Sequence, residues 1–325
     1  MDLLLALSPG SVVDTPALRR AGLDDRRVTS LVRDGHLVRL SRGWYAVGAA
    51  PTPQSAHRLA AQAATQGYAG RAVLSHYSAL VDRGLPTFRA DLATVHLTRT
   101  QSLHSRRRPG LVIHRRPPLG AWRDGQLTVS FVIAQTATTC GPMAALIAAD
   151  AALQRNLVSR AELLAAADLV KGHPRTALLS GFLGLADARC QSPGETRLRH
   201  AFHVMGLPVA SQVVITDGRR SATVDFMLTD HPVIGEFDGL VKYRRTRPAD
   251  GFPAGYDEIV AEKGREDWLR GLGFEFVRTV WTDFDDVSSL ARRTCSAIER
   301  TRGRPVPEAW LRARDLASAR EAALR

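Results

Sequence analysis

Two acidic residues interrupt otherwise apolar, strand-like sequence in the last third of this 325-residue chain. Asp225 lies in Thr-Val-Asp-Phe-Met-Leu, and Glu236 lies in Val-Ile-Gly-Glu-Phe-Asp-Gly. Burying an ionised carboxylate without a partner costs several kcal/mol, so a strand seldom carries one without a use. On adjacent antiparallel strands the two side chains can lie nearly opposite each other, where a divalent cation between them relieves their repulsion. The pair therefore predicts a metal site in which Asp225 and Glu236 bind Mg²⁺ or Mn²⁺.

Other side chains nearby in the sequence can complete such a site. Glu195 and Asp238 can bind the cation directly or through water, and Lys242 or Lys263 can offset charge on a reacting phosphodiester. A metal bound in this way lowers the pKa of an attacking water and orients the phosphodiester. The predicted catalytic set is Glu195, Asp225, Glu236, Asp238 and Lys263.

Simpler structural roles compete with this interpretation. Asp225 can form a structural ion pair with an arginine such as Arg265. Asp238 with Gly239 can be only a turn, and Glu195 can be only a helix-start acid that the helix dipole favours. The sequence leaves these alternatives open.

The segment from Ser192 onward has the signals of helix, three strands, helix and strand. Ser192-Pro193 combines a capping hydroxyl with proline at the first helical position, and Asp217-Gly218 is a hairpin turn. Asp230-His231-Pro232 turns the chain into a third strand. The predicted elements are a helix to about Met205, strands Val209–Thr216, Ala222–Leu228 and Val233–Phe237, a helix at about Tyr256–Gly271, a strand at Phe274–Val280 and a last helix at about Phe284–Arg302.

The first fifty residues predict a winged helix-turn-helix. Thr15-Pro16 starts a short helix that stops at Gly22, and a basic second helix runs from about Asp24 to Gly35. Two β-type runs, His36–Leu40 and Gly43–Val47, follow as a hairpin. An amphipathic helix with a solvated basic face is the competing interpretation. The residues expected to contact DNA are Arg26, Arg27, Thr29, Ser30, Arg33 and Arg42.

The middle of the chain predicts helices mixed with short strands. Ser102–Arg108 is expected to be a basic loop. The predicted elements are helices at Gln54–Gln66 and Ser75–Val81, strands at Ala93–Thr98, Leu111–His114 and Leu127–Ile133, and a helical run from Pro142 to about Ala188. The fold class is thus α/β, as several α+β domains: residues 1–50 (winged helix), 51–190 (middle domain, mostly helical with short strands), 191–303 (a core ordered α, β, β, β, α, β) and 304–325 (a helical C-terminal tail).

The charge is unevenly distributed along the chain. Lys and Arg number 44 against 32 Asp and Glu, a net charge of +12, and residues 1–190 carry +11 of it. This imbalance favours a polyanionic partner for the first part of the chain. No apolar run approaches the ~20 residues that span a bilayer, and Asp2 does not fit a signal peptide. Three widely separated cysteines show no metal-ligand spacing, so we expect a reduced, cytoplasmic protein without a membrane partner.

The motifs of the last third suggest a known superfamily. They are Glu195 in the opening helix, Val-Asp225-Phe, Gly-Glu236-Phe-Asp238-Gly, Lys263-Gly-Arg265-Glu-Asp267-Trp-Leu-Arg and Leu-Gly-Phe-Glu-Phe-Val-Arg278. Residues 192–285 thereby resemble the PD-(D/E)XK nucleases, in particular the branch similar to very-short-patch-repair endonucleases. The resemblance implies a restriction-endonuclease-like core with Asp225 and Glu236 as metal ligands. Asp238 stands where the family usually carries lysine, so Lys242, Lys263 or neither supplies the positive charge.

The N-terminal runs resemble a second family. They are Thr15-Pro-Ala-Leu-Arg-Arg-Ala-Gly22, Val28–Gly35, Leu37–Ala46, Val73–Ala79, Gly84-Leu-Pro86 and Val95–Thr98. Residues 1–50 are similar to the winged-helix domain of AbiEi-type antitoxins, which repress type IV toxin–antitoxin loci, and the later runs resemble the segment that follows in that family.

Two functions follow as expectations. The first is an Mg²⁺-dependent endonuclease that docks on double-stranded DNA through the winged helix and cuts through the C-terminal domain. The second is an antitoxin-like transcriptional regulator in which the nuclease fold is catalytically silent. A homodimer on a symmetric site and a cognate toxin are the further partners that these functions imply. An RNA-processing enzyme is a weaker third expectation.

Overall fold

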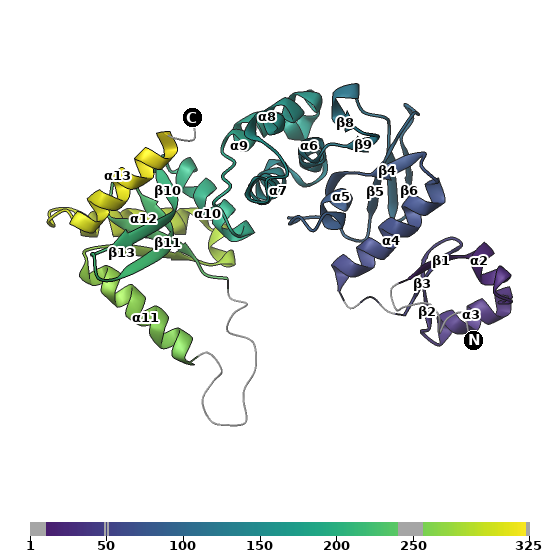
Figure 1. Cartoon of the computed structure of the whole chain (residues 1–325), viewed down its shortest axis with the longest axis horizontal. Coiled ribbons are helices and arrows are strands. Elements are labelled where there is room, and N and C mark those ends of the chain that lie inside the picture. The colour runs from purple at the N-terminus through teal and green to yellow at the C-terminus, as the bar shows by residue number, and fades with distance from the viewer. Residues whose placement is uncertain (1–10, 49, 51, 240–255, 323–325) are drawn as a thin grey trace. The chain divides into compact units, whose positions relative to one another are not determined.

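The N-terminal residues form two short helices beside a small sheet. The computed structural model describes residues 11–48, 50, 52–239 and 256–322, and the chain divides into two compact units, Met1–Ala186 and Asp187–Arg325 (Figure 1). The elements are β1 (Val12–Asp14), α2 (Thr15–Arg20), α3 (Asp25–Arg33), β2 (Leu37–Ser41) and β3 (Trp44–Val47), with strand order β1-β3-β2. The predicted helices and hairpin are confirmed, but the hydroxyl of Thr15 does not cap α2. The Asp14 carboxylate accepts the Ala17 N–H instead.

A four-stranded sheet follows within the first unit. It is built from β4 (Ala72–Leu74), β5 (Val95–Arg99), β7 (Leu111–His114) and β6 (Arg106–Arg108), in that order, with β5 and β7 parallel. Helices α4 (Pro53–Tyr68) and α5 (His76–Asp82) pack against it. The expected basic loop is wrong at Arg106–Arg108, which pair with β7 as an edge strand. Their side chains are exposed, as suits a charged sheet edge.

The rest of the first unit is largely helical. Its helices are α6 (Val129–Cys140), α7 (Pro142–Gln154), α8 (Arg160–Leu169) and α9 (Leu179–Gly184), and a two-stranded sheet pairs β8 (Trp122–Arg123) with β9 (Gln126–Leu127). The predicted strand at Leu127–Ile133 is wrong, because Thr128 caps α6 by accepting the Phe131 N–H. Residues 130–137 are all buried. A run that is apolar on every side has no periodicity that distinguishes a helix from a strand.

The second unit confirms the predicted order of helix, three strands, helix and strand. Its elements are α10 (Pro193–Val204), β10 (Val209–Thr216), β11 (Ser221–Leu228), β12 (Val233–Phe237), α11 (Tyr256–Gly271), β13 (Glu275–Thr279), α12 (Val287–Thr301) and α13 (Glu308–Ala322). The strand order is β10-β11-β12-β13, with the first two pairings antiparallel and the last parallel. Ser192 caps α10 by accepting the Glu195 N–H. The predicted C-terminal tail is α13, which packs against β10.

Helices cover this sheet on two faces. One core joins α11 and α13 to side chains such as Met227 and Ile234, and another joins α10 and α12 to side chains such as Phe226 and Val233. Gly235 allows α10 to approach closely, because a Cβ there would lie 2.6 Å from the Phe202 ring. This contact holds α10 against the sheet, and the first turn of α10 carries Glu195.

The fold is therefore mixed α/β, with several small sheets distributed over two units. Among the described residues, no helix has both the length and the apolar character that crossing a bilayer requires.

Candidate functional site

The register of the second sheet brings the two predicted acids together. Phe226 pairs with Gly235 and Met227 with Ile234, so the same register places Asp225 opposite Glu236 on the face toward α11. The Phe237 N–H donates to Asp225 Oδ2 over 2.9 Å. Burial raises the pKa of both carboxyl groups, and in each case the charge of a neighbouring acid raises it further. The sheet thus holds two carboxylates that are each costly to ionise.

Glu195 joins this pair from the first turn of α10. Its side chain is buried, and Oε2 accepts the Gln191 N–H over 2.9 Å and the Gln212 side-chain amide over 3.1 Å. The charge of Glu195 contributes to the raised pKa of Asp225, so the two carboxylates lie within electrostatic reach of each other. Glu195 is therefore part of the acidic group as well as a residue of the helix start.

Gln212 is a member of the site that the sequence analysis missed. It lies opposite Asp225 in the β10–β11 register, and its backbone has a φ of +50°, in the left-handed region. A non-glycine residue there is strained, and such residues collect at functional sites. A glutamine within the apolar run Val-Ala-Ser-Gln-Val-Val was the available signal.

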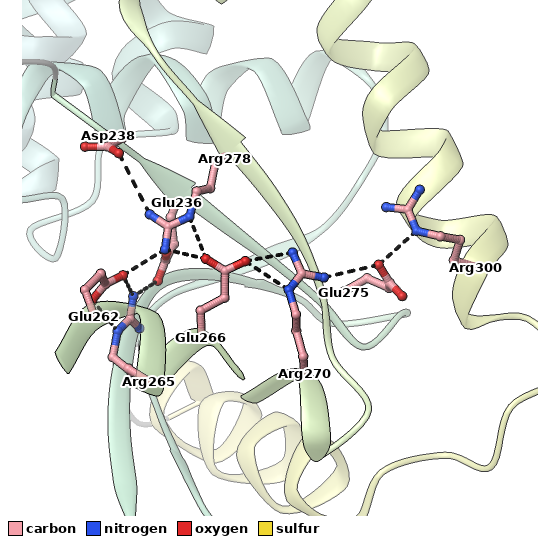
Figure 2. A network of polar contacts seen from close by, with 9 residues as sticks. All are labelled: Glu236, Asp238, Glu262, Arg265, Glu266, Arg270, Glu275, Arg278 and Arg300. Atoms are coloured by element: carbon pink, nitrogen blue, oxygen red, sulfur yellow. Dashed lines mark hydrogen bonds and ion pairs between the residues drawn. The ribbon is translucent and has the colours of Figure 1, made fainter. Parts of the chain in front are cut away.

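Two arginines form ion pairs with the carboxylate of Glu236 (Figure 2). Arg265 of α11 lies 2.6 Å from Oε1, and Arg278 of β13 lies 3.3 Å from Oε2. The predicted competitor, an ion pair between Arg265 and Asp225, is wrong, because Arg265 pairs with Glu236 and Glu262. Among the described residues, Asp225 makes no ion pair within 4.0 Å.

The two arginines belong to a larger set of charges that we call the acid–arginine network. Glu262 lies 2.6 Å from Arg265 and 2.8 Å from Arg278, and Glu266 lies 2.9 Å from Arg278 (Figure 2). Hydrogen bonds from Arg265 and Arg278 lower the pKa of Glu262 to about 2. The network comprises Glu236, Asp238, Glu262, Arg265, Glu266 and Arg278.

The remaining predicted catalytic residues lie around this network. Asp238 is half-buried at the end of β12, with its carboxylate 3.9 Å from Arg278 and its N–H donating to the carbonyl of Thr279. Lys263 is exposed on α11, with no ion pair to a described residue. Lys242 lies outside the described residues. The structure therefore brings Glu195, Asp225, Glu236 and Asp238 together and leaves Lys263 apart from their contacts.

The acidic group fits a magnesium ion poorly in this arrangement. Mg²⁺ requires free carboxylate oxygens in near-octahedral geometry, whereas each oxygen of Glu236 already faces a guanidinium group. Among the described residues, three metal-ligating side chains gather within 4.8 Å of one another at His76, His96 and His114, far along the chain from these acids. The geometry thus shows a buried carboxylate group neutralised in part by arginine.

The predicted DNA-contacting residues lie on the outer face of α3 and the hairpin turn. Arg26, Arg27, Thr29, Arg33 and Arg42 are exposed, whereas Val28 and Leu31 are buried in the core of the N-terminal sheet. Ser30 is half-buried and donates to Asp34, which also pairs with Arg33 over 3.3 Å.

Arg26 and Arg27 of α3 are exposed. Neither makes an ion pair within 4.0 Å among the described residues, although Asp25 pairs with Arg19 in the preceding helix. Both therefore remain available to an anionic partner.

Comparison with known proteins extends this description. No protein-family profile matches the chain. The curated relatives include two named uncharacterized protein MT2308 (Mycobacterium tuberculosis strain CDC 1551 / Oshkosh) and uncharacterized protein Rv2248 (strain ATCC 25618 / H37Rv). Each is 27% identical over 277 residues, which is 83% of this chain and 96% of the relative. Because the first unit ends at residue 186, a match of that length extends across both units.

Proposed function

We propose that this protein is a duplex-DNA-binding regulator, similar to the AbiEi antitoxins, in which α3 and the β2–β3 hairpin form a winged-helix contact surface. Its second unit would be a PD-(D/E)XK-like domain in which the acidic site is held by arginines rather than used for cutting. The observation that carries the choice between regulator and nuclease is the double ion pair of Glu236 with Arg265 and Arg278.

The N-terminal surface supports the DNA-binding part of the proposal. Arg26 and Arg27 lie in the first turn of α3, after its Asp24 cap, and both side chains are exposed. The excess of +11 in residues 1–190 provides a field that attracts a polyanion. Phosphate contacts of this kind give binding that weakens as salt rises, because each contact releases condensed counterions.

The salt dependence of binding tests this part. We expect the double variant Arg26→Ala/Arg27→Ala to bind duplex DNA more weakly and to reduce the slope of log K against log salt by about 2, one unit per lost phosphate contact. Fluorescence anisotropy with a labelled duplex measures both quantities. Arg312→Ala is the matched control, since Arg312 is exposed on α13 and, within the described part of the chain, pairs only with Glu308. An unchanged slope in the double variant would place the DNA contact elsewhere.

A metal-dependent endonuclease is the second candidate, and Asp225 favours it. Asp225 is half-buried beside Glu195, and among the described residues no cation pairs with it. Among the described residues, neither carboxylate makes an ion pair with the acid–arginine network, although the charge of Arg265 partly opposes the raised pKa of Asp225. A cation at this position would supply Lewis-acid activation of water, while Gln212 would keep Glu195 oriented.

A plasmid-nicking assay with added Mg²⁺ or Mn²⁺ separates the two functions. If the protein is a regulator, the wild type should cleave the plasmid no more than the variants Asp225→Asn and Glu236→Gln do. Cleavage that both variants abolish, and that the surface control Glu299→Gln retains, would replace the regulator with the endonuclease. Glu299 of α12 suits the control because, among the described residues, it pairs only with the exposed Arg302 that follows the helix.

A further inference from the structure

Three histidines meet on one face of the β4-β5-β7-β6 sheet. His96 lies on β5 and His114 on the neighbouring parallel strand β7, two residues beyond the register partner of His96. Side chains two apart on a strand share a face, so both rings point to the same side of the sheet. That face is opposite to α4, which packs on Val95, Leu97 and Ile113.

His76 completes the group from the start of α5. Helix α5 begins directly after β4, and the Ser75 N–H donates to the carbonyl of His96 over 3.1 Å, which fixes the helix start against β5. Nitrogen atoms of the three rings all lie within 4.8 Å of one another, and His96 Nδ1 is 2.8 Å from His114 Nε2. We call His76, His96 and His114 the histidine cluster.

The cluster lies in a site that keeps imidazole neutral. His76 and His96 are buried and His114 is half-buried. Burial lowers the pKa of His96 to about 3 and that of His114 to about 4, and it lowers the pKa of His76 as well. A metal requires a lone pair on one nitrogen of each ring, so its binding would replace the hydrogen bond that His96 Nδ1 and His114 Nε2 share.

Two features go beyond what a packed core needs. His76 has a φ of +51°, a strained conformation for a residue with a side chain. The hydroxyl of Thr98 is fully buried and has no hydrogen-bond partner among the described residues. Thr98 is the register partner of His114 and lies two residues from His96, so it shares their face of the sheet. An unpaired buried hydroxyl is costly, and an oxygen ligand on a bound ion would satisfy it.

We propose that the histidine cluster binds one divalent transition-metal ion through a nitrogen of each ring. Imidazole is a preferred ligand of Zn²⁺, Co²⁺, Ni²⁺ and Cu²⁺, and three histidines leave a coordination position open for an outside ligand beside Thr98. The His76 and His114 rings are stacked with centroids 3.9 Å apart. Binding of one ion through both rings would require His76 or His114 to rotate out of this stack.

Titration of the untagged, full-length, chelator-treated protein with Co²⁺ tests the proposal. We expect one ion per chain, with visible absorption of a nitrogen- and oxygen-ligated site and without the near-ultraviolet charge-transfer band of a cysteine thiolate. Zn²⁺ should displace the Co²⁺ and raise the melting temperature by mass action. Absence of uptake in the wild-type protein, or a thiolate band, would overturn the assignment whether or not any variant folds.

A variant pair assigns the ion to these residues. His114→Gln, at the half-buried member, should weaken Co²⁺ binding at least 10-fold while circular dichroism shows an intact fold. His104→Gln should bind as the wild type does, because His104 is exposed and lies outside the cluster. Equal affinity of the two variants would overturn the proposal.

Discussion

The histidine cluster and the acid–arginine network bury ionisable groups on neighbouring strands by different physical means. Among the described residues, the histidines have no carboxylate in ion-pair contact, so burial keeps them neutral. Glu236 instead faces guanidinium groups from α11 and β13, which offset part of the cost of burying its charge. The histidine cluster contains a strained residue at positive φ, His76, and a second such residue, Gln212, lies beside the acids Glu195 and Asp225 of the second sheet. The difference implies that a cation at the first sheet would replace a hydrogen bond and a ring stack but no ion pair, whereas the second sheet already pairs its acids with arginine.

Acidification of the metal-free protein gives the largest expected contrast between the two clusters. The unfolded chain protonates its histidines near the ordinary pKa of 6.5, whereas folded His96 and His114 have pKa values of about 3 and about 4. Below about pH 6.5 the unfolded state therefore binds more protons, and stability falls by up to several kcal/mol as the pH approaches 4. Glu262 affects stability only at lower pH. Its pKa is lowered from 4.5 to about 2, so its contribution to the stability of the folded state persists until the pH falls below about 4.5.

Hydrogen exchange measures this loss of stability. Protection of the amides of β5 and β7, corrected for the intrinsic effect of pH on exchange, is compared with protection of those of β12 and β13 in the same sample. We expect protection of the first pair of strands to fall between about pH 7 and about pH 5, while the second pair holds. His114→Gln should flatten the profile of the first pair. A simultaneous loss at both sheets would contradict the contrast.

Removal of one guanidinium gives the next largest effect. Arg278→Met removes one ion-pair partner from each of Glu236, Glu262 and Glu266. We therefore expect the free energy of unfolding of the second unit to fall by about 2–3 kcal/mol. Denaturant unfolding followed by tryptophan fluorescence measures the change. Arg302→Met is the control, because exposed Glu299 is its one ion-pair partner among the residues that the structure describes. An ion pair on the surface contributes less than about 1 kcal/mol. Equal losses in the two variants would mean that the network does not hold the acids.

The sequence predicted what depends on local signals. Ser192-Pro193 and Asp217-Gly218 located α10 and the first hairpin, because a helix cap and a tight turn require particular residues at particular positions. The same signals, with the turn after β11, sufficed to place Asp225 opposite Glu236.

Partners that arrive from distant elements were not predictable in this way. Arg265 and Arg278 reach Glu236 from α11 and β13, and the choice of Glu236 over Asp225 depends on how these elements pack. The histidine cluster unites residues from α5, β5 and β7 with no metal-ligand spacing in the sequence. The cluster forms only because the histidines of β5 and β7 lie on the face of the sheet opposite to α4. The sequence of a short alternating strand does not specify which of its faces a helix covers.

The smallest effect concerns backbone strain at Gln212. Like His76 in the histidine cluster, Gln212 has a positive φ, and it lies beside the acids of the second sheet. Gln212→Gly and Gln212→Ala both remove the amide that donates to Glu195, so they differ mainly in the backbone at φ +50°. Glycine adopts the left-handed region without a Cβ clash, although it loses more entropy on folding. We therefore expect the glycine variant to be more stable than the alanine variant by about 1 kcal/mol in denaturant unfolding. If alanine is the more stable of the two, the strand is not strained at this position, and the two sheets share only the burial of ionisable groups.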